Sequence, residues 1–73
     1  MVVNTQKLKG KIVEKNTTQE NVAKLCNMNR TTFYRKMKKG GDDFTIGEIH
    51  SMVSGIPLTR EEAMEIFFKQ KSQ

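Results

Sequence analysis

The residues best suited to bind a charged ligand lie close together in the run RTTFYRKMK, in the middle of the chain. If this run is helical, Phe33 and Met37 share one face, because residues four apart lie one above the other. Thr31, Arg35 and Lys38 then fall on roughly the opposite face. A helix that is apolar on one side and basic and hydrogen-bonding on the other could lie in a DNA major groove.

The residues just before this run predict how the basic helix is held. Residues 18–38 are typical of a short helix, a tight turn and a second helix that ends near Lys38, before two glycines. Asn27 suits the turn because asparagine tolerates the left-handed backbone conformation. Asn29 is a good N-cap for the basic helix, and we expect Met28 between them to contact the core.

The first helix of this pair has a predicted buried stripe and an ambiguous start. Either Thr17, in a capping box with Glu20, or Thr18 could be the N-cap. Ala23 is small where a second helix must cross closely. The residues expected on the buried stripe are Val22, Ala23, Leu25 and Cys26.

The pair is preceded by an expected loose arm at residues 1–4 and a first helix at residues 5–15. Its apolar face is formed by Leu8 and Ile12, with Val13 beside it. Gly10 in the middle costs about 1 kcal/mol relative to alanine. It indicates either that another backbone passes close by or that a weak helix tolerates a glycine.

Two capping boxes predict two further helices after the pair. In each box a threonine N-cap is followed three residues later by a glutamate, as in Thr45 with Glu48 and Thr59 with Glu62. Apolar residues occupy both staple positions around each box; these are Phe44 with Ile49, and Leu58 with Ala63.

These two helices are expected to support the helix pair with further inward-facing residues. The helix after Thr45 should point Ile46, Ile49 and Val53 inward and end at Gly55 and Pro57. The last helix should run to about Lys69, before a polar tail at residues 70–73.

The last helix carries more apolar residues than one buried face needs. Ala63, Ile66 and Phe67 can face the core, which leaves Met64 and Phe68 partly exposed. We predict that these two residues help to form a dimer contact. The alternative is that they fold over the core of a small monomer.

These patterns together predict the fold class. Residues 1–73 should form a single all-α domain, a compact bundle of about five short helices with a helix-turn-helix motif at residues 18–38. A chain of this size buries only around 60% of its unfolded surface, so it needs well-packed helices or a second copy.

Charge is divided unevenly along the chain. Residues 1–40 contain ten lysines and arginines against two glutamates, a balance of +8, whereas residues 41–73 have three against six, a balance of −3. Lysines are often ordinary solvated surface, but this segregation favours a polyanion as partner of the first half.

Several classes of function find no support in the residues. The one cysteine, Cys26, and the one histidine, His50, give neither a disulfide nor a metal-ligand pattern. No nucleophile–base set or glycine-rich phosphate loop is present, so we expect neither an enzyme nor a cofactor. Without an apolar leader or an 18-residue apolar run, we expect a cytoplasmic protein with no membrane segment.

The central stretch resembles the helix-turn-helix of the lambda-repressor-like family, and in particular small phage and prophage Cro- or repressor-type proteins. The matching residues are Gln19, Ala23, Asn27, Asn29 and Phe33. The resemblance extends over most of the chain, because the family also has one helix before the motif and two after it. Asn27 departs from the glycine usual at the turn, and the segment between Met37 and Phe44 is unusual in its two glycines and two aspartates.

The resemblance implies roles for individual residues. The residues at positions that read base edges are Arg30, Thr31 and Arg35, of which Arg35 best fits the O6 and N7 acceptors of guanine. The residues expected to contact the DNA backbone are Gln19, Asn29, Thr32, Tyr34 and Lys38.

The protein is therefore expected to be a sequence-specific transcriptional regulator. Its expected partner is a double-stranded DNA operator. Because one recognition helix reads only a few base pairs, a homodimer on a pseudo-palindromic operator is expected. The alternative is a protein-interaction module, an antirepressor or adaptor that keeps the fold without reading DNA.

Overall fold

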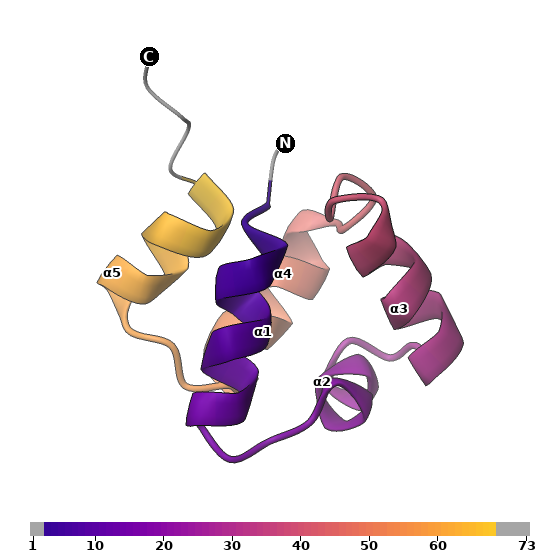
Figure 1. The fold of residues 1–73 in the computed structure, drawn as a ribbon, viewed down its shortest axis with the longest axis horizontal. Coiled ribbons are helices and arrows are strands. Elements are labelled where there is room, and N and C mark those ends of the chain that lie inside the picture. Colours follow the sequence, from indigo (N-terminus) through magenta and orange to yellow (C-terminus); the bar gives the residue numbers. More distant parts are fainter. Residues whose placement is uncertain (1–2, 69–73) are drawn as a thin grey trace.

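Helix α1 runs through the middle of the molecule, with α3 on one side and α5 on the other (Figure 1). The computed structural model describes residues 3–68, and every regular element in this range is a helix. The elements are α1 (Thr5–Glu14), α2 (Gln19–Leu25), α3 (Arg30–Lys38), α4 (Ile46–Gly55), α5 (Arg60–Ala63) and a π-helical segment, η1 (Met64–Phe68). The predicted all-α bundle of short helices is confirmed.

Each α-helix begins at a side chain that accepts a backbone N–H three residues further on, which satisfies one of the free donors of the first turn. These N-caps are Asn4, Thr18, Asn29, Thr45 and Thr59. Thr18 rather than Thr17 therefore starts α2. Both predicted capping boxes are present, since Glu48 and Glu62 accept the backbone N–H of their own N-cap residues at 3.0 and 2.9 Å.

The core takes apolar side chains from every helix. Its largest fully buried members are Phe33, Phe67, Leu8, Ile12, Met52, Ile56, Ile66 and Val22. Helix α2 lies at the centre of the packing, in contact with α1, α3 and α4. Ala23, which is fully buried, allows this close approach.

The prediction of a loose arm at residues 1–4 is wrong for residues 3 and 4. Val3 is 4% exposed and belongs to the core, and its N–H donates to the Gly40 carbonyl at 3.4 Å. The Asn4 N–H donates to the Ile66 carbonyl at 2.8 Å. A Cβ on Gly41 would overlap the Val3 side chain, so this glycine after the end of α3 also makes room for the start of the chain.

Three residues expected near the core are exposed instead. Val13 is 73% exposed, Leu25 45% and Ile46 69%. Each lies roughly a quarter turn or more away from the buried stripe of its own helix, because successive residues are about 100° apart. The predicted inward positions of Ile49 and Val53 are confirmed, because Ile49 is buried and Val53 packs against the core.

Glycine allows a close contact in α4, not in α1. Nothing lies within 4 Å of a Cβ placed on Gly10. The expectation that another backbone passes close to Gly10 is therefore wrong, and α1 tolerates the glycine. A Cβ on Gly55 would overlap the Leu25 side chain. Leu25 thus lies against α4 although much of it is exposed.

The last helix changes its geometry after Ala63, where the α-helix continues as the π-helical η1. Ala63, Ile66 and Phe67 face the core, and Met64 and Phe68 remain 50% and 46% exposed, as predicted. Residues 1–2 of the arm, the expected helix end at Lys69 and the polar tail at 70–73 lie outside the described residues.

Ion pairs join α1 to the last helix. The Glu62 carboxylate lies 2.8 Å from Lys11 Nζ and 3.5 Å from Lys15 Nζ, and Lys7 pairs with Glu65. The hydrogen bond from Lys11, followed by that from the Thr59 backbone, lowers the pKa of Glu62 from 4.5 to about 2.

The lowered pKa of Glu62 predicts a pH dependence of stability. Its interactions stabilise the fold fully above about pH 4.5, and this contribution is lost as the pH falls towards 2. A Glu62→Gln variant should therefore show a flatter dependence of its unfolding midpoint on pH in this window. The matched control is Glu61→Gln, because Glu61 is exposed and has no ion pair among residues 3–68. Unfolding midpoints are measured by circular dichroism. If those of the two variants fall equally as the pH decreases from 4.5 to 2, the prediction is contradicted.

None of the helices in residues 3–68 combines the length and the apolar character needed to cross a membrane.

Candidate nucleic-acid interface

Helix α3 is held from one side. Phe33 is fully buried, Met37 is 6% exposed, and the Phe33 ring packs on Phe44 with centroids 5.6 Å apart. The turn before α3 has its predicted form: Asn27 has a φ of 61°, and the Asn29 side chain accepts the Thr32 N–H at 2.8 Å. The amide NH2 of Asn29 is left to donate to a ligand.

The outer face of α3 carries the groups expected to read DNA. Arg35 lies almost opposite the line from Phe33 to Met37, as helical periodicity requires. The exposed residues of this face and its edges are Arg30, Thr31, Tyr34, Arg35 and Lys38. Thr32 and Gln19 are half-buried. The structure thus brings the predicted DNA-contacting residues onto α3 and the adjoining start of α2.

Arg30 is already in contact with a neighbour. Its guanidinium lies over the Tyr34 ring, 6.0 Å from the centroid. An exposed cation–π contact contributes about 0.5–1 kcal/mol. Because this is less than a good bidentate contact to a base, Arg30 can leave the ring when an acceptor is offered.

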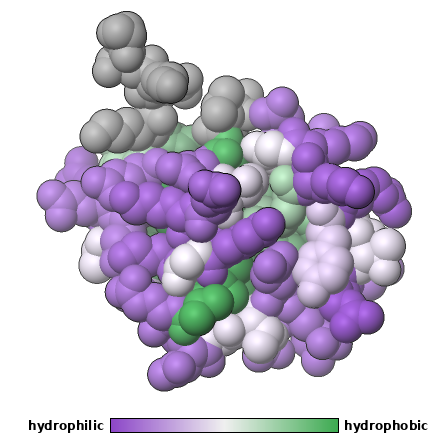
Figure 2. Space-filling view, in the orientation of Figure 1, coloured by the Kyte–Doolittle hydropathy of each residue, from purple (hydrophilic) through white to green (hydrophobic). Residues whose placement is uncertain are grey.

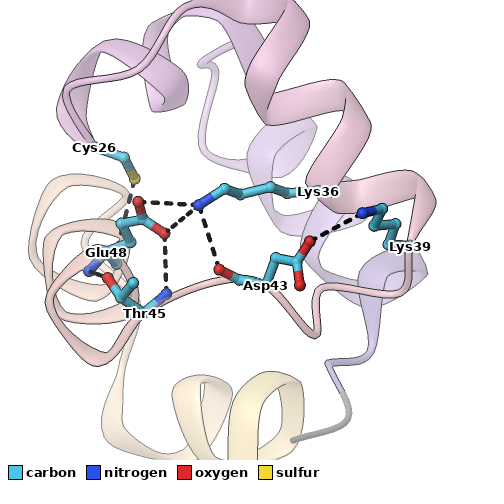
Figure 3. A network of polar contacts seen from close by, with 6 residues as sticks. All are labelled: Cys26, Lys36, Lys39, Asp43, Thr45 and Glu48. Carbon is cyan, nitrogen blue, oxygen red and sulfur yellow. Dashed lines mark hydrogen bonds and ion pairs between the residues drawn. The ribbon is translucent and has the colours of Figure 1, made fainter.

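Among residues 3–68, Lys36 is the one basic residue of α3 that forms an ion pair (Figure 3). Its Nζ donates to both carboxylate oxygens of Glu48, at 3.1 and 3.2 Å, and to the Asp43 carbonyl at 3.3 Å. Glu48 also accepts the Thr45 N–H, so one carboxylate caps α4 and holds α3 against it. Lys39 pairs with Asp43 at 3.3 Å beside this network. The contacts fix the angle of α3 relative to α4.

The buried thiol of Cys26 borders the same network. Its Sγ donates to the Glu48 carbonyl at 3.6 Å, and burial, followed by the Glu48 charge, raises the thiol pKa to about 11. The thiol therefore stays protonated at neutral pH and acts as an apolar residue with a weak donor, not as a nucleophile.

The basic residues of residues 3–68 separate into two groups. The lysines that pair with carboxylates of the bundle are Lys7, Lys11, Lys15, Lys36 and Lys39. The basic residues without an ion pair in this part of the chain are Lys9, Lys24, Arg30, Arg35, Lys38 and Arg60. Half of the unpaired group belongs to α3, so the positive charge available to a ligand is concentrated on this helix.

A hollow beside α3 brings together residues from three helices. It has a volume of about 310 Å³ and is lined by Lys9, Gln19, Tyr34, Met37 and Lys38. The residues that line this concave surface carry two ammonium groups, an amide and a phenol. Such donors bind the phosphate oxygens of a nucleic-acid backbone.

Lys9 is a member of this site that sequence reasoning missed. It is exposed on α1, one residue after the buried Leu8. Its position among charged neighbours of α1 carries no signal that it faces α3. Only the packing of α1 beside the helix pair brings Lys9 to Gln19 and Lys38.

No protein-family model, curated protein or solved structure matches the chain. The surface viewed in Figure 2 is hydrophilic over most of its area. Met64 and Phe68, the predicted dimer residues, lie away from the α3 face, on the border between α4 and the last helix.

Proposed function

We propose that the protein is a sequence-specific double-stranded DNA-binding regulator that inserts α3 into the major groove. The observation that carries the proposal is the separation of paired and unpaired basic residues, which leaves the outer face of α3 basic and without a carboxylate. A major groove about 12 Å wide accepts one α-helix. Helices α2 and α3 then act as a helix-turn-helix motif.

The two kinds of DNA contact are assigned to different residues. Arg30, Thr31 and Arg35 are proposed to read base edges, because they project from the outer face and the first turn of α3. The residues proposed to bind the backbone are Gln19, Asn29, Thr32, Tyr34, Lys38 and, from the hollow, Lys9. Phosphate contacts supply most of the affinity and make it dependent on salt.

The resemblance to small phage and prophage repressors extends this proposal. A repressor of the Cro type would bind a pseudo-palindromic operator as a homodimer, in the cytoplasm. One α3 spans only a few base pairs, so the second copy supplies the missing specificity.

Selection of bound sites from random double-stranded DNA tests the proposal. We expect enrichment of a short consensus, repeated with two-fold symmetry about one helical turn apart. Gel-shift titration of the selected site against unrelated competitor then gives the specificity ratio. Failure to enrich any sequence, with the protein folded by circular dichroism, would reject sequence-specific binding.

Lys9 provides a separate test of the hollow. A Lys9→Ala variant should bind selected and unrelated DNA more weakly by similar factors. The slope of log K against log salt should also decrease by about 1, because one phosphate contact is lost. Arg60→Ala removes an equally unpaired cation from the other end of the bundle and should leave the slope unchanged on a single half-site. A normal slope for Lys9→Ala would exclude a phosphate contact at this position.

A protein-interaction module is the second candidate. It is favoured by an apolar groove between α4 and the last helix, which a DNA-binding domain does not need for the α3 face. The gel-shift experiment separates the candidates, because an adaptor that only keeps the fold would show no preference for any DNA sequence.

A further inference from the structure

An apolar groove of about 500 Å³ lies between α4 and the last helix. The buried lining residues, Ile49 and Ala63, form its floor, and the small side chain of Ala63 leaves room above it. The walls carry the exposed apolar side chains of Ile46, Met64 and Phe68. A small molecule is usually held with roughly 70–90% of its surface buried, whereas this groove is open and covers only one side of its occupant.

Both walls of the groove have helical spacing. The wall residues of α4 are Ile46, His50 and Val53. The wall residues of the last helix are Arg60, Met64 and Phe68. Members of each set are three or four positions apart, so each set lies along one side of its helix and extends for about 10 Å. Apolar residues at i, i+4 and i+7 of another helix span about the same length, so about two turns of a partner helix match the groove.

The charged and polar groups of the groove are donors. Arg60 lines the groove and has no ion pair among residues 3–68. His50 adds an imidazole, which can also donate a hydrogen bond. All eight acidic side chains of the chain belong to residues 3–68, and none of them lines the groove, including Glu61, which follows Arg60 in the sequence. The groove is therefore complementary to an apolar partner that carries carboxylates.

A second copy of the chain is a less suitable occupant. In a two-fold contact the same patch faces itself, so two copies of Arg60 and of His50 would enter one apolar interface. Neither groove would supply a carboxylate to pair with them, and an unpaired charge in such an interface is costly. The dimer contact predicted for Met64 and Phe68 is therefore the alternative that an experiment has to exclude.

We propose that the groove binds an acidic amphipathic helix of a partner protein, with apolar residues at i, i+4 and i+7 and with Asp or Glu beside them. An amphipathic helix that places its apolar face in a groove is a common mode of recognition. The apolar residues of the partner contact Ile46, Met64 and Phe68, and its carboxylate accepts hydrogen bonds from Arg60. Such a partner is what the interaction module would require, and the groove can bind it whether or not α3 binds DNA.

The arrangement of the bundle leaves both surfaces accessible at once. Helices α3 and α5 lie towards opposite ends of the long axis of the molecule (Figure 1), along which it measures 35 Å. A helix in the groove therefore leaves the outer face of α3 free. Together with the proposed DNA binding, on which this step rests, the groove would bring an acidic partner to the DNA site.

Peptide selection tests the groove without DNA. The probes are phage-displayed, alanine-based helices of about 15 residues, the length at which such helices begin to be stable. They are randomised at three positions spaced i, i+4 and i+7 and at the neighbouring positions. The most enriched peptide is then synthesised in two forms, one with its acidic residues and one with each replaced by the corresponding amide.

The affinities of both peptides are measured by fluorescence anisotropy for wild type and three variants. Met64→Gln/Phe68→Gln removes apolar contacts of the groove without adding charge, and Arg60→Gln removes its cation. The control is Val13→Gln, which makes the same apolar-to-amide change at a residue that is 73% exposed on α1. Circular dichroism establishes that each variant is folded.

We expect the selected peptides to share the three apolar residues and adjacent Asp or Glu. Met64→Gln/Phe68→Gln should bind the acidic peptide about tenfold or more weakly, because apolar anchors are lost, and Val13→Gln should bind it like wild type. Arg60→Gln should weaken binding of the acidic peptide by about two- to fivefold, as expected of an exposed ion pair. It should leave the affinity for the amide peptide unchanged.

Several results would overturn the proposal. These are the absence of enrichment, equal wild-type affinity for the acidic and amide peptides, and a selected peptide that binds Met64→Gln/Phe68→Gln as well as wild type. Sedimentation that shows dimers of wild type and monomers of this variant would assign the groove to a second copy. Binding to phosphatidylglycerol vesicles that the same variant loses, without any selected peptide, would assign it to a membrane surface. Each result leaves the DNA-binding proposal intact, because that proposal is tested separately by gel shift.

Discussion

An Arg35→Ala variant is expected to lose about 1–3 kcal/mol of binding free energy for its selected DNA and much less for unrelated DNA. Arg35 lies opposite the buried Phe33 and Met37, on the exposed face of α3. No carboxylate in residues 3–68 pairs with it. The guanidinium is therefore free to donate two parallel hydrogen bonds to the O6 and N7 atoms of guanine.

Arg35→Lys is the matched variant, because it keeps the charge and removes the planar fork. We expect it to retain the salt dependence of wild-type binding while losing most of the selectivity. Quantitative gel shifts on the selected site and on single-base variants measure both effects. If Arg35→Ala reduces binding to all sequences equally, Arg35 contacts phosphate instead, and another residue of α3 reads the bases.

The parts of the fold that depend on neighbours in sequence could be predicted. The capping boxes at Thr45 and Thr59 need only four consecutive residues each, and both are present. The left-handed Asn27 and the N-cap Asn29 are similarly local. These signals fixed the number of helices and most of their starts, because helix ends are decided by free backbone groups within one turn.

Several errors concern which side of a helix faces inward. Val13, Leu25 and Ile46 are apolar, and each adjoins a buried stripe, but none belongs to it. Periodicity gives the width of an apolar arc, whereas the neighbouring helices decide how much of that arc they cover. For Ile46 the uncovered part lies in the groove between α4 and the last helix. Its exposure is therefore a tertiary property.

The candidate DNA-binding face could be predicted only in part. The outward position of Arg35 follows from helical phase, but the removal of Lys36 from that face does not. Its partners Asp43 and Glu48 come from the following segment and from α4. In the same way, Lys9 joins the hollow through the packing of α1. The sequence shows the net charge, whereas the fold decides which charges remain available.

A Phe33→Ala variant is expected to lose about 3–5 kcal/mol of the free energy of unfolding, as is usual for a deleted core phenylalanine. Phe33 is fully buried, and its ring packs on Phe44. Domains of this kind have only about 5–15 kcal/mol in total. A chain of 73 residues lies at the low end of this range. The variant should therefore be partly unfolded at room temperature, and its remaining folded fraction should hold α3 loosely.

Phe68→Ala is the matched control, because it removes the same ring from a position that is 46% exposed. Urea unfolding followed by circular dichroism should place its midpoint close to wild type and that of Phe33→Ala far below it. Saturating selected DNA should raise the Phe33→Ala midpoint, since a ligand that binds only the folded state stabilises it. Similar midpoints for the two variants would show that the Phe33 ring is not what seats α3. The geometry of the candidate DNA-binding face would then have to come mainly from the Lys36–Glu48 contact.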